Sequence, residues 1–182
     1  MNLIAVRHGA IPLNFEEKLS GWIDQDLSPE GVQQAERLSQ TLPGGFDTII
    51  ASPLLRAAHT ARILNANHPA SLVFDPNLRE RNFGSLNGKT WAEAEAETGL
   101  DLRHLDVDLM QYDYRAYGGE SADGVFARVR QAVHSALKLA GDKDIVLVTH
   151  GGVIKVLYSL LDYESRESIT NCSVHRFHPR FK

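Results

Sequence analysis

Short runs of apolar residues alternate along the chain with longer stretches in which apolar residues recur at helical spacing. The short runs are rich in aliphatic and β-branched residues and are bounded by glycine, proline or polar residues, a pattern that predicts buried strands. We expect these strands at residues 3–6, 48–51, 72–74, 144–149 and 171–178. The runs that begin at residues 3 and 144 both end in a histidine followed by glycine.

The stretches between these runs predict helices. Ser28-Pro29 and Ser52-Pro53 each open one, because a serine hydroxyl can cap the first turn and proline suits the first helical position. Ser121 opens the longest helix, in which apolar residues recur every three or four positions. Further helices are expected at residues 151–161 and, from weaker patterns, at 90–98 and 102–111.

The order of these elements predicts a single α/β domain over residues 1–182. Each of the first strands is followed by a helix, as in units with parallel strands, and no repeat, linker or low-complexity segment interrupts the series. The pattern loosens only between residues 75 and 119, where tyrosines lie among charged residues. We interpret residues 75–119 as a small cap over the sheet.

The composition limits the class of protein and its expected location. Hydrophobic residues make up 43% of the 182 residues and charged residues 23%, enough to bury a core and stay soluble. The formal charge of -4 gives no basic footprint of a nucleic-acid-binding protein. Cys172 is the single cysteine, so an internal disulfide is excluded. We find neither a signal peptide nor an apolar run long enough to cross a membrane, and expect a cytoplasmic protein with no membrane partner.

Two of the expected strands are each followed by a histidine, and in a parallel sheet both histidines would lie at the same edge. His8 follows the first strand and His150 follows the strand over 144–149. Arg7 is beside the first histidine, and Arg56 falls in the first turn of the helix after strand 48–51. Two guanidinium groups and two imidazoles near helix N-termini suit a phosphate or another dianion.

A histidine in such a place can act as a nucleophile. Neutral imidazole attacks phosphorus without a separate base, and its ordinary pKa of about 6.5 keeps it available near neutral pH. The reaction also needs an acid for the departing alkoxide, and Glu80 stands between two arginines in the segment after strand 72–74. We expect a bound dianion to raise the pKa of Glu80, which suits a general acid that later becomes a base.

With these residues the chain resembles branch 1 of the histidine phosphatase superfamily, the phosphoglycerate mutase-like type. The resemblance extends over nearly the whole chain, with its motifs in the family's order. The motifs are Arg7-His8-Gly9 with Asn14 and Ser20-Gly21-Trp22, then residues 52–61 (SPLLRAAHTA), 78–88 (LRERNFGSLNG), 118–121 (GGES) and 148–152 (VTHGG).

The resemblance implies a three-layer α/β/α fold with a central, mostly parallel sheet, and a reaction through a phosphohistidine on His8. It implies that Arg7, Arg56 and His150 hold the phosphoryl group and that Glu80 is the proton donor. The substrate-binding residues that it implies are Asn14, Ser20, Gly21 and Gly151. No metal and no organic cofactor is expected, and the partner would be a small phosphorylated metabolite.

The sequence departs from the family pattern at three positions: Ala10 replaces an acidic residue, Leu13 a tryptophan and Tyr117 a proline. These changes concern the lining of the leaving-group pocket rather than the nucleophile. The chain is also shorter than typical phosphoglycerate mutases and lacks their extended tail, which favours a phosphatase over a mutase. A phosphoglycerate-type mutase and a catalytically idle phospholigand-binding protein remain as alternatives, and the oligomeric state is left open.

Two other patterns are weaker. Residues 84–90 (GSLNGKT) resemble a P-loop but have one residue too few between the glycines. Cys172, His175 and His178 are spaced by three, which on a strand divides them between opposite faces and disfavours a zinc site.

Overall fold

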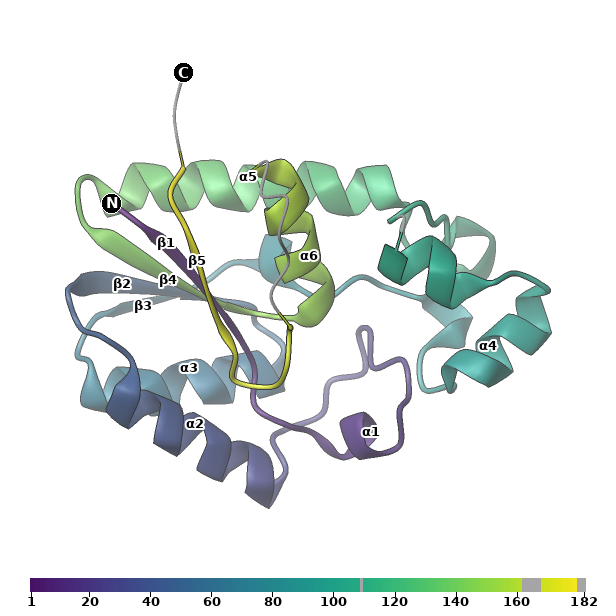
Figure 1. The fold of residues 1–182 in the computed structure, drawn as a ribbon, viewed down its shortest axis with the longest axis horizontal. Helices are drawn as coiled ribbons and strands as arrows, with labels where there is room; N and C mark the ends of the chain where they lie inside the picture. The colour runs from purple at the N-terminus through teal and green to yellow at the C-terminus, as the bar shows by residue number, and fades with distance from the viewer. Residues whose placement is uncertain (109, 162–167, 180–182) are drawn as a thin grey trace.

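The computed structural model describes residues 1–108, 110–161 and 168–179. Within them a single five-stranded sheet has the strand order β3-β2-β4-β1-β5 (Figure 1). The four strands β3, β2, β4 and β1 are parallel, and β5 pairs antiparallel with β1 at one edge. The strands are β1 Leu3–Arg7, β2 Phe46–Ala51, β3 Ser71–Phe74, β4 Asp144–Thr149 and β5 Val174–Phe177.

Helices cover both faces of the sheet, so the predicted three-layer α/β/α architecture is confirmed (Figure 1). Helices α2 (Pro29–Thr41) and α3 (Leu55–Asn67) lie on one face, and α5 (Ala122–Ala140) and α6 (Gly151–Leu160) on the other. Side chains alternate between the two faces along each strand: Leu3 and Ala5 join the core under α5 and α6, while Ile4 and Val6 join the core that includes α3 residues.

The ends of several elements differ from the predicted ones. Helix α3 begins at Leu55 rather than at Ser52-Pro53, because the Ser52 hydroxyl lies beside His150 instead of capping a first turn. The segment predicted to be helical over 102–111 contains a five-residue π-helix, His104–Asp108, and position 109 lies outside the described residues. The last strand is shorter than 171–178, since Cys172 has a φ of 57° and the chain turns there.

The region 75–119 lies beyond the carboxyl ends of the parallel strands (Figure 1). It holds α4 (Trp91–Thr98) and the 3-10 turns Pro76–Leu78, Gly84–Leu86 and Arg115–Tyr117. A short helix, α1 (Pro12–Phe15), lies in the loop that follows β1. No helix among the described residues is long and apolar enough to cross a membrane.

Candidate active site

The parallel pairing of β1 with β4 brings the two predicted histidines together. Arg7 pairs with Thr149 in register, so His8 and His150 follow at the same edge of the sheet. Their ring centroids are 5.1 Å apart, and both side chains are buried. The convergence expected from the sequence is therefore present.

The hydrogen bonding of His8 fixes which ring nitrogen can react. Nδ1 lies 2.7 Å from the carbonyl oxygen of Gly9. A carbonyl oxygen only accepts, so Nδ1 carries the proton and Nε2 keeps its lone pair. Burial, and then the positive charges of Arg56 and Arg7, lower the pKa of His8 well below its usual value. The ring is therefore neutral at pH 7, the form that a nucleophile requires.

The second histidine has the complementary arrangement. Nε2 of His150 lies 2.8 Å from the Ser52 hydroxyl oxygen, which already accepts the N–H of Leu54 at 3.3 Å. The Ser52 proton can then point at Nε2, which leaves the proton of the neutral ring on Nδ1. Burial, followed by Arg56 and His8, lowers the pKa of His150 well below its usual value. Its Nδ1 is buried and has no hydrogen-bond partner among the described residues.

Both predicted arginines are fixed by backbone carbonyls. Arg7 donates from Nη1 to the carbonyl of Ile169 at 2.8 Å. Arg56 is completely buried and donates to the carbonyls of Ile23 and Gly21, both at 2.8 Å. Burial lowers the pKa of Arg56 to about 10, against the raising effects of Glu80 and Asp24, so the guanidinium remains charged at pH 7. The Nε atoms of Arg7 and Arg56 are buried without a hydrogen-bond partner in the described part of the chain.

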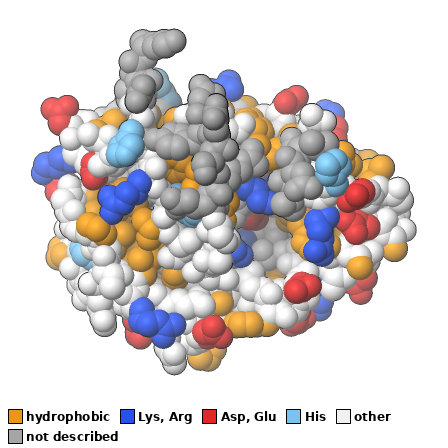
Figure 2. Space-filling view, viewed as in Figure 1, with side chains coloured by type: hydrophobic (Ala, Val, Ile, Leu, Met, Phe, Trp, Pro, Cys, Tyr) orange, Lys and Arg blue, Asp and Glu red, His pale blue; other side chains and the backbone are white. Residues whose placement is uncertain are grey.

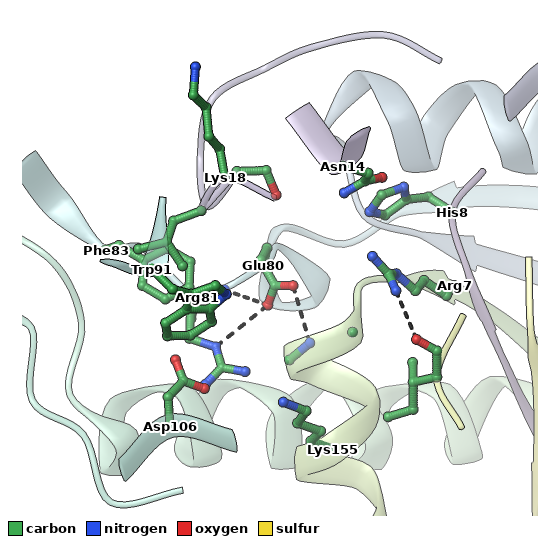
Figure 3. A pocket seen from close by; sticks show the side chains of 15 residues that line it. Arg7, His8, Asn14, Lys18, Glu80, Arg81, Phe83, Trp91, Asp106 and Lys155 are labelled. Carbon is green, nitrogen blue, oxygen red and sulfur yellow. Dashed lines mark hydrogen bonds and ion pairs between the residues drawn. The ribbon is translucent and has the colours of Figure 1, made fainter. Parts of the chain in front are cut away.

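Glu80 lies across the cavity from this group and is itself well bound (Figure 3). Its carboxylate accepts the backbone N–H groups of Arg81 at 2.9 Å and Gly152 at 3.1 Å. Burial raises the pKa of Glu80, but the Arg81 guanidinium, these two N–H groups and Arg56 together lower it below the usual value. The local donors thus stabilise the carboxylate, and the effect of a bound dianion on the pKa of Glu80 stays a prediction.

A cavity of about 230 Å³ lies between His8 and Glu80 (Figure 3). Of the predicted residues, it is lined by Arg7, His8, Asn14, Ser20, Glu80 and Gly151. The other three do not line it. Arg56 and His150 are fully buried. Gly21 contributes its carbonyl oxygen to Arg56, and its φ of 40° suits glycine.

The cavity also contains residues that sequence reasoning did not assign to the site. Arg81, one of the two arginines that flank Glu80 in the sequence, is buried and lines the cavity, with an ion pair to Asp106. Gly152 packs so closely that a Cβ there would lie 2.3 Å from a Glu80 oxygen. In the sequence, only its position next to Gly151 could have indicated that Gly152 belongs to the site. Lys18, Trp91 and Lys155 line the cavity as well and belong to no motif used above.

The molecular surface around the site carries mixed charge. Figure 2 shows a hollow on this face with both basic and acidic side chains around it, and no extended surface of one sign. Among the described residues no group of three histidine, cysteine or acidic side chains is arranged to bind a metal ion.

Comparisons with known proteins agree with the arrangement of the fold. Residues 3–180 match the family described as histidine phosphatase superfamily (branch 1). The chain is 35% identical to phosphoglycerate mutase-like protein 4 of Arabidopsis thaliana, over 96% of this chain and 78% of that protein.

Two solved structures are similar in fold. A phosphoglycerate mutase from Thermus thermophilus superposes with a TM-score of 0.76 at 32% identity, over 97% of this chain and 92% of the other. A mycobacterial glucosyl-3-phosphoglycerate phosphatase in complex with VO3 gives a TM-score of 0.80 at 26% identity, covering 96% and 90% of the two chains.

Proposed function

Because this chain belongs to branch 1 of the histidine phosphatase superfamily, we propose that it hydrolyses a small phosphorylated metabolite through a phosphohistidine on His8. Superfamily relatives include phosphatases and mutases, so phosphoryl transfer is the shared chemistry. The proposed reaction needs no metal and no organic cofactor, since charged side chains supply the electrostatic stabilisation.

The observation that most supports this proposal is a set of three buried N–H donors that have no hydrogen-bond partner among the described residues. They are Nε of Arg7, Nε of Arg56 and Nδ1 of His150, all close to the nucleophile. A buried unpaired donor costs about 1–3 kcal/mol, so three together favour a ligand that accepts from them. A phosphoryl group has the oxygens and the charge to do so.

In the first step Nε2 of His8 attacks phosphorus and the bond to the ester oxygen breaks. Arg7, Arg56 and His150 stabilise the negative charge on the phosphoryl oxygens. Glu80 gives its proton to the departing oxygen, which leaves as an alcohol. A phosphoryl dianion in the cavity raises the pKa of Glu80 above its value in the empty site, so the carboxyl can carry this proton.

In the second step water attacks the phosphohistidine and Glu80, now ionised, accepts a proton from it. The bond between Nε2 and phosphorus breaks, inorganic phosphate forms, and neutral His8 is restored. Glu80 regains the protonation state from which the cycle began, so the two steps balance.

A phosphoglycerate-type mutase is the second candidate, favoured by the names of the relatives. It would pass the phosphoryl group from His8 to a second hydroxyl rather than to water. A phospholigand-binding protein without activity fits the site less well, because binding alone does not require an acid such as Glu80.

The test is phosphate release from a panel of esters by the wild type, His8→Ala and His59→Ala. The panel contains an aryl phosphate, sugar phosphates, phosphoglycerates and α-ribazole phosphate. His59 lies on α3, partly exposed and paired with Asp26, so its variant is a matched control that keeps full activity. We expect His8→Ala to lose turnover entirely and chelators to change nothing.

Each other outcome has a definite meaning. Appreciable turnover by folded His8→Ala contradicts the phosphohistidine mechanism. Interconversion of phosphoglycerates faster than phosphate release identifies a mutase. Activity lost on chelation and restored by a divalent ion contradicts the metal-free mechanism.

A further inference from the structure

We propose that the leaving group of the substrate is an uncharged alcohol, and that Asp106 imposes this preference by offsetting the charge of Arg81. The inference rests on the proposed hydrolysis and adds the class of ester on which it acts. It comes from the end of the cavity away from Arg7 and His8, where Arg81 and Asp106 both line the wall (Figure 3).

Arg81 has the position of a residue that could bind a carboxylate on the substrate, but its charge is already offset. It is 4% exposed, and one guanidinium nitrogen forms an ion pair with Asp106. The guanidinium carbon also lies 4.7 Å from the centre of the Tyr112 ring. On its other side the group packs on Gly152, where a Cβ would come within 2.4 Å of Nη2. The charge of Arg81 is therefore offset before any substrate anion enters.

Asp106 is fixed just as firmly. It is 1% exposed; one carboxylate oxygen binds Arg81, and the other accepts the hydroxyl of Tyr114 at 2.9 Å. A buried carboxylate that is bound on both oxygens stays in place while substrate enters. An acidic leaving group at this end would therefore meet a buried ion pair without net charge, and would lose its hydration with no cation to replace it.

Other charged side chains of both signs lie around this end of the cavity. Lys18 forms an ion pair with Glu16. Two further cations line the cavity or its outer extension, Lys155 and Arg103, and two further acids, Glu80 and Glu17, do so as well. Apolar wall is added by Leu19, Phe83, Trp91 and Ile169. The phosphoryl end differs, because no ion pair joins Arg7 or Arg56 to a carboxylate in the described part of the chain. Among the described residues, the two arginines of the phosphoryl end thus have no direct carboxylate partner, whereas Arg81 at the other end has one, which suits an uncharged group there.

The first measurement uses the wild type and two esters that differ at one carbon. These are sn-glycerol 1-phosphate and D-3-phosphoglycerate, which share the arrangement at the middle carbon and present a hydroxymethyl group and a carboxylate at the same place. We expect kcat/KM for phosphate release to be at least about tenfold higher for the glycerol ester. Equal values, or a preference for the acid, overturn the inference while leaving the hydrolase proposal intact. Failure to hydrolyse any ester of the wider panel overturns both.

The second measurement tests the part played by Asp106. Asp106→Asn keeps the shape of the side chain and removes the negative charge, so the preference for the uncharged ester should fall about tenfold. Tyr114→Phe is the matched control: it removes a hydrogen bond to the same carboxylate but no charge, and should leave the ratio within about twofold. An unchanged ratio in Asp106→Asn, or an equal change in Tyr114→Phe, assigns the selectivity elsewhere and overturns the role of Asp106. The wild-type comparison decides the substrate class even where Asp106→Asn does not fold.

Discussion

The protonation states of the residues at this site are set mainly by the groups around them. Gly9 and Ser52 determine which nitrogens of His8 and His150 carry protons. Backbone N–H groups and Arg81 keep Glu80 ionised in the empty site. The sequence predicted the reactive side chains because they follow strands in recognisable motifs. It could not predict these protonation states, since burial and long-range contacts set them.

Arg81 illustrates the same limit. Its neighbours in the sequence are charged or polar, and a solvated arginine was as reasonable an interpretation as a buried one. Its burial depends on Asp106, which lies 25 positions away in a segment without a clear helical pattern. No feature of the sequence near either residue indicates that the two form an ion pair.

Glu80→Gln tests the acid. The variant cannot donate the proton, so we expect kcat for an alkyl phosphate to fall by about 10²–10⁴. An aryl phosphate, whose leaving group needs less protonation, should lose much less. Steady-state kinetics on both esters, with the exposed Glu36→Gln as control, measures the difference. Equal losses on the two esters would exclude proton donation by Glu80.

The secondary-structure elements show a clearer division between what the sequence predicts and what it does not. The strand Asp144–Thr149 and the start of α2 after Ser28 match the expected bounds, because an apolar run and a capping serine are local signals. The helix expected over 102–111 is present over 102–108, mostly as a π-helix, and α3 begins at Leu55, later than expected. In both places tertiary contacts, Asp106 with Arg81 and Ser52 with His150, replaced the local preference.

Helix α5 helps to position the segment that carries Glu80, although its sequence pattern does not indicate this. Arg128 looks like a surface residue of a long amphipathic helix. It is 14% exposed at its side chain and donates to the backbone carbonyls of Asn77, Arg79 and Glu80. It also pairs with Glu120 at 2.9 Å. The segment that carries Glu80 is therefore fixed to α5.

Arg128→Gln should lower both stability and activity. Several buried carbonyls and a carboxylate lose their donor, so we expect the free energy of unfolding to fall by about 2–4 kcal/mol. We expect kcat to fall as well, because Glu80 is no longer fixed in position. Urea unfolding and kinetics measure the two effects. Arg130→Gln, an exposed arginine on the same helix, is the control and should change neither. A variant that loses stability but keeps full kcat would mean that Arg128 has no part in placing Glu80.

At the scale of the whole molecule, the sheet concentrates positive charge and buried imidazole at one edge, and this affects folding. The two histidines are neutral in the folded protein because burial and the neighbouring arginines lower the pKa of each. In the unfolded chain their pKa returns to about 6.5. Below that pH the unfolded chain binds more protons than the folded one, so acid favours unfolding.

Lowering the pH from 7.0 to 5.5 should therefore destabilise the unliganded protein. Each of the two histidines contributes up to about 1.4 kcal/mol per pH unit below pH 6.5, and nothing well above it. Urea unfolding at several pH values, in buffers without phosphate, measures the slope. His8→Gln should lose about half of this contribution. A slope that His8→Gln leaves unchanged would show that folding does not lower the pKa of His8, which contradicts the electrostatic environment described for the site.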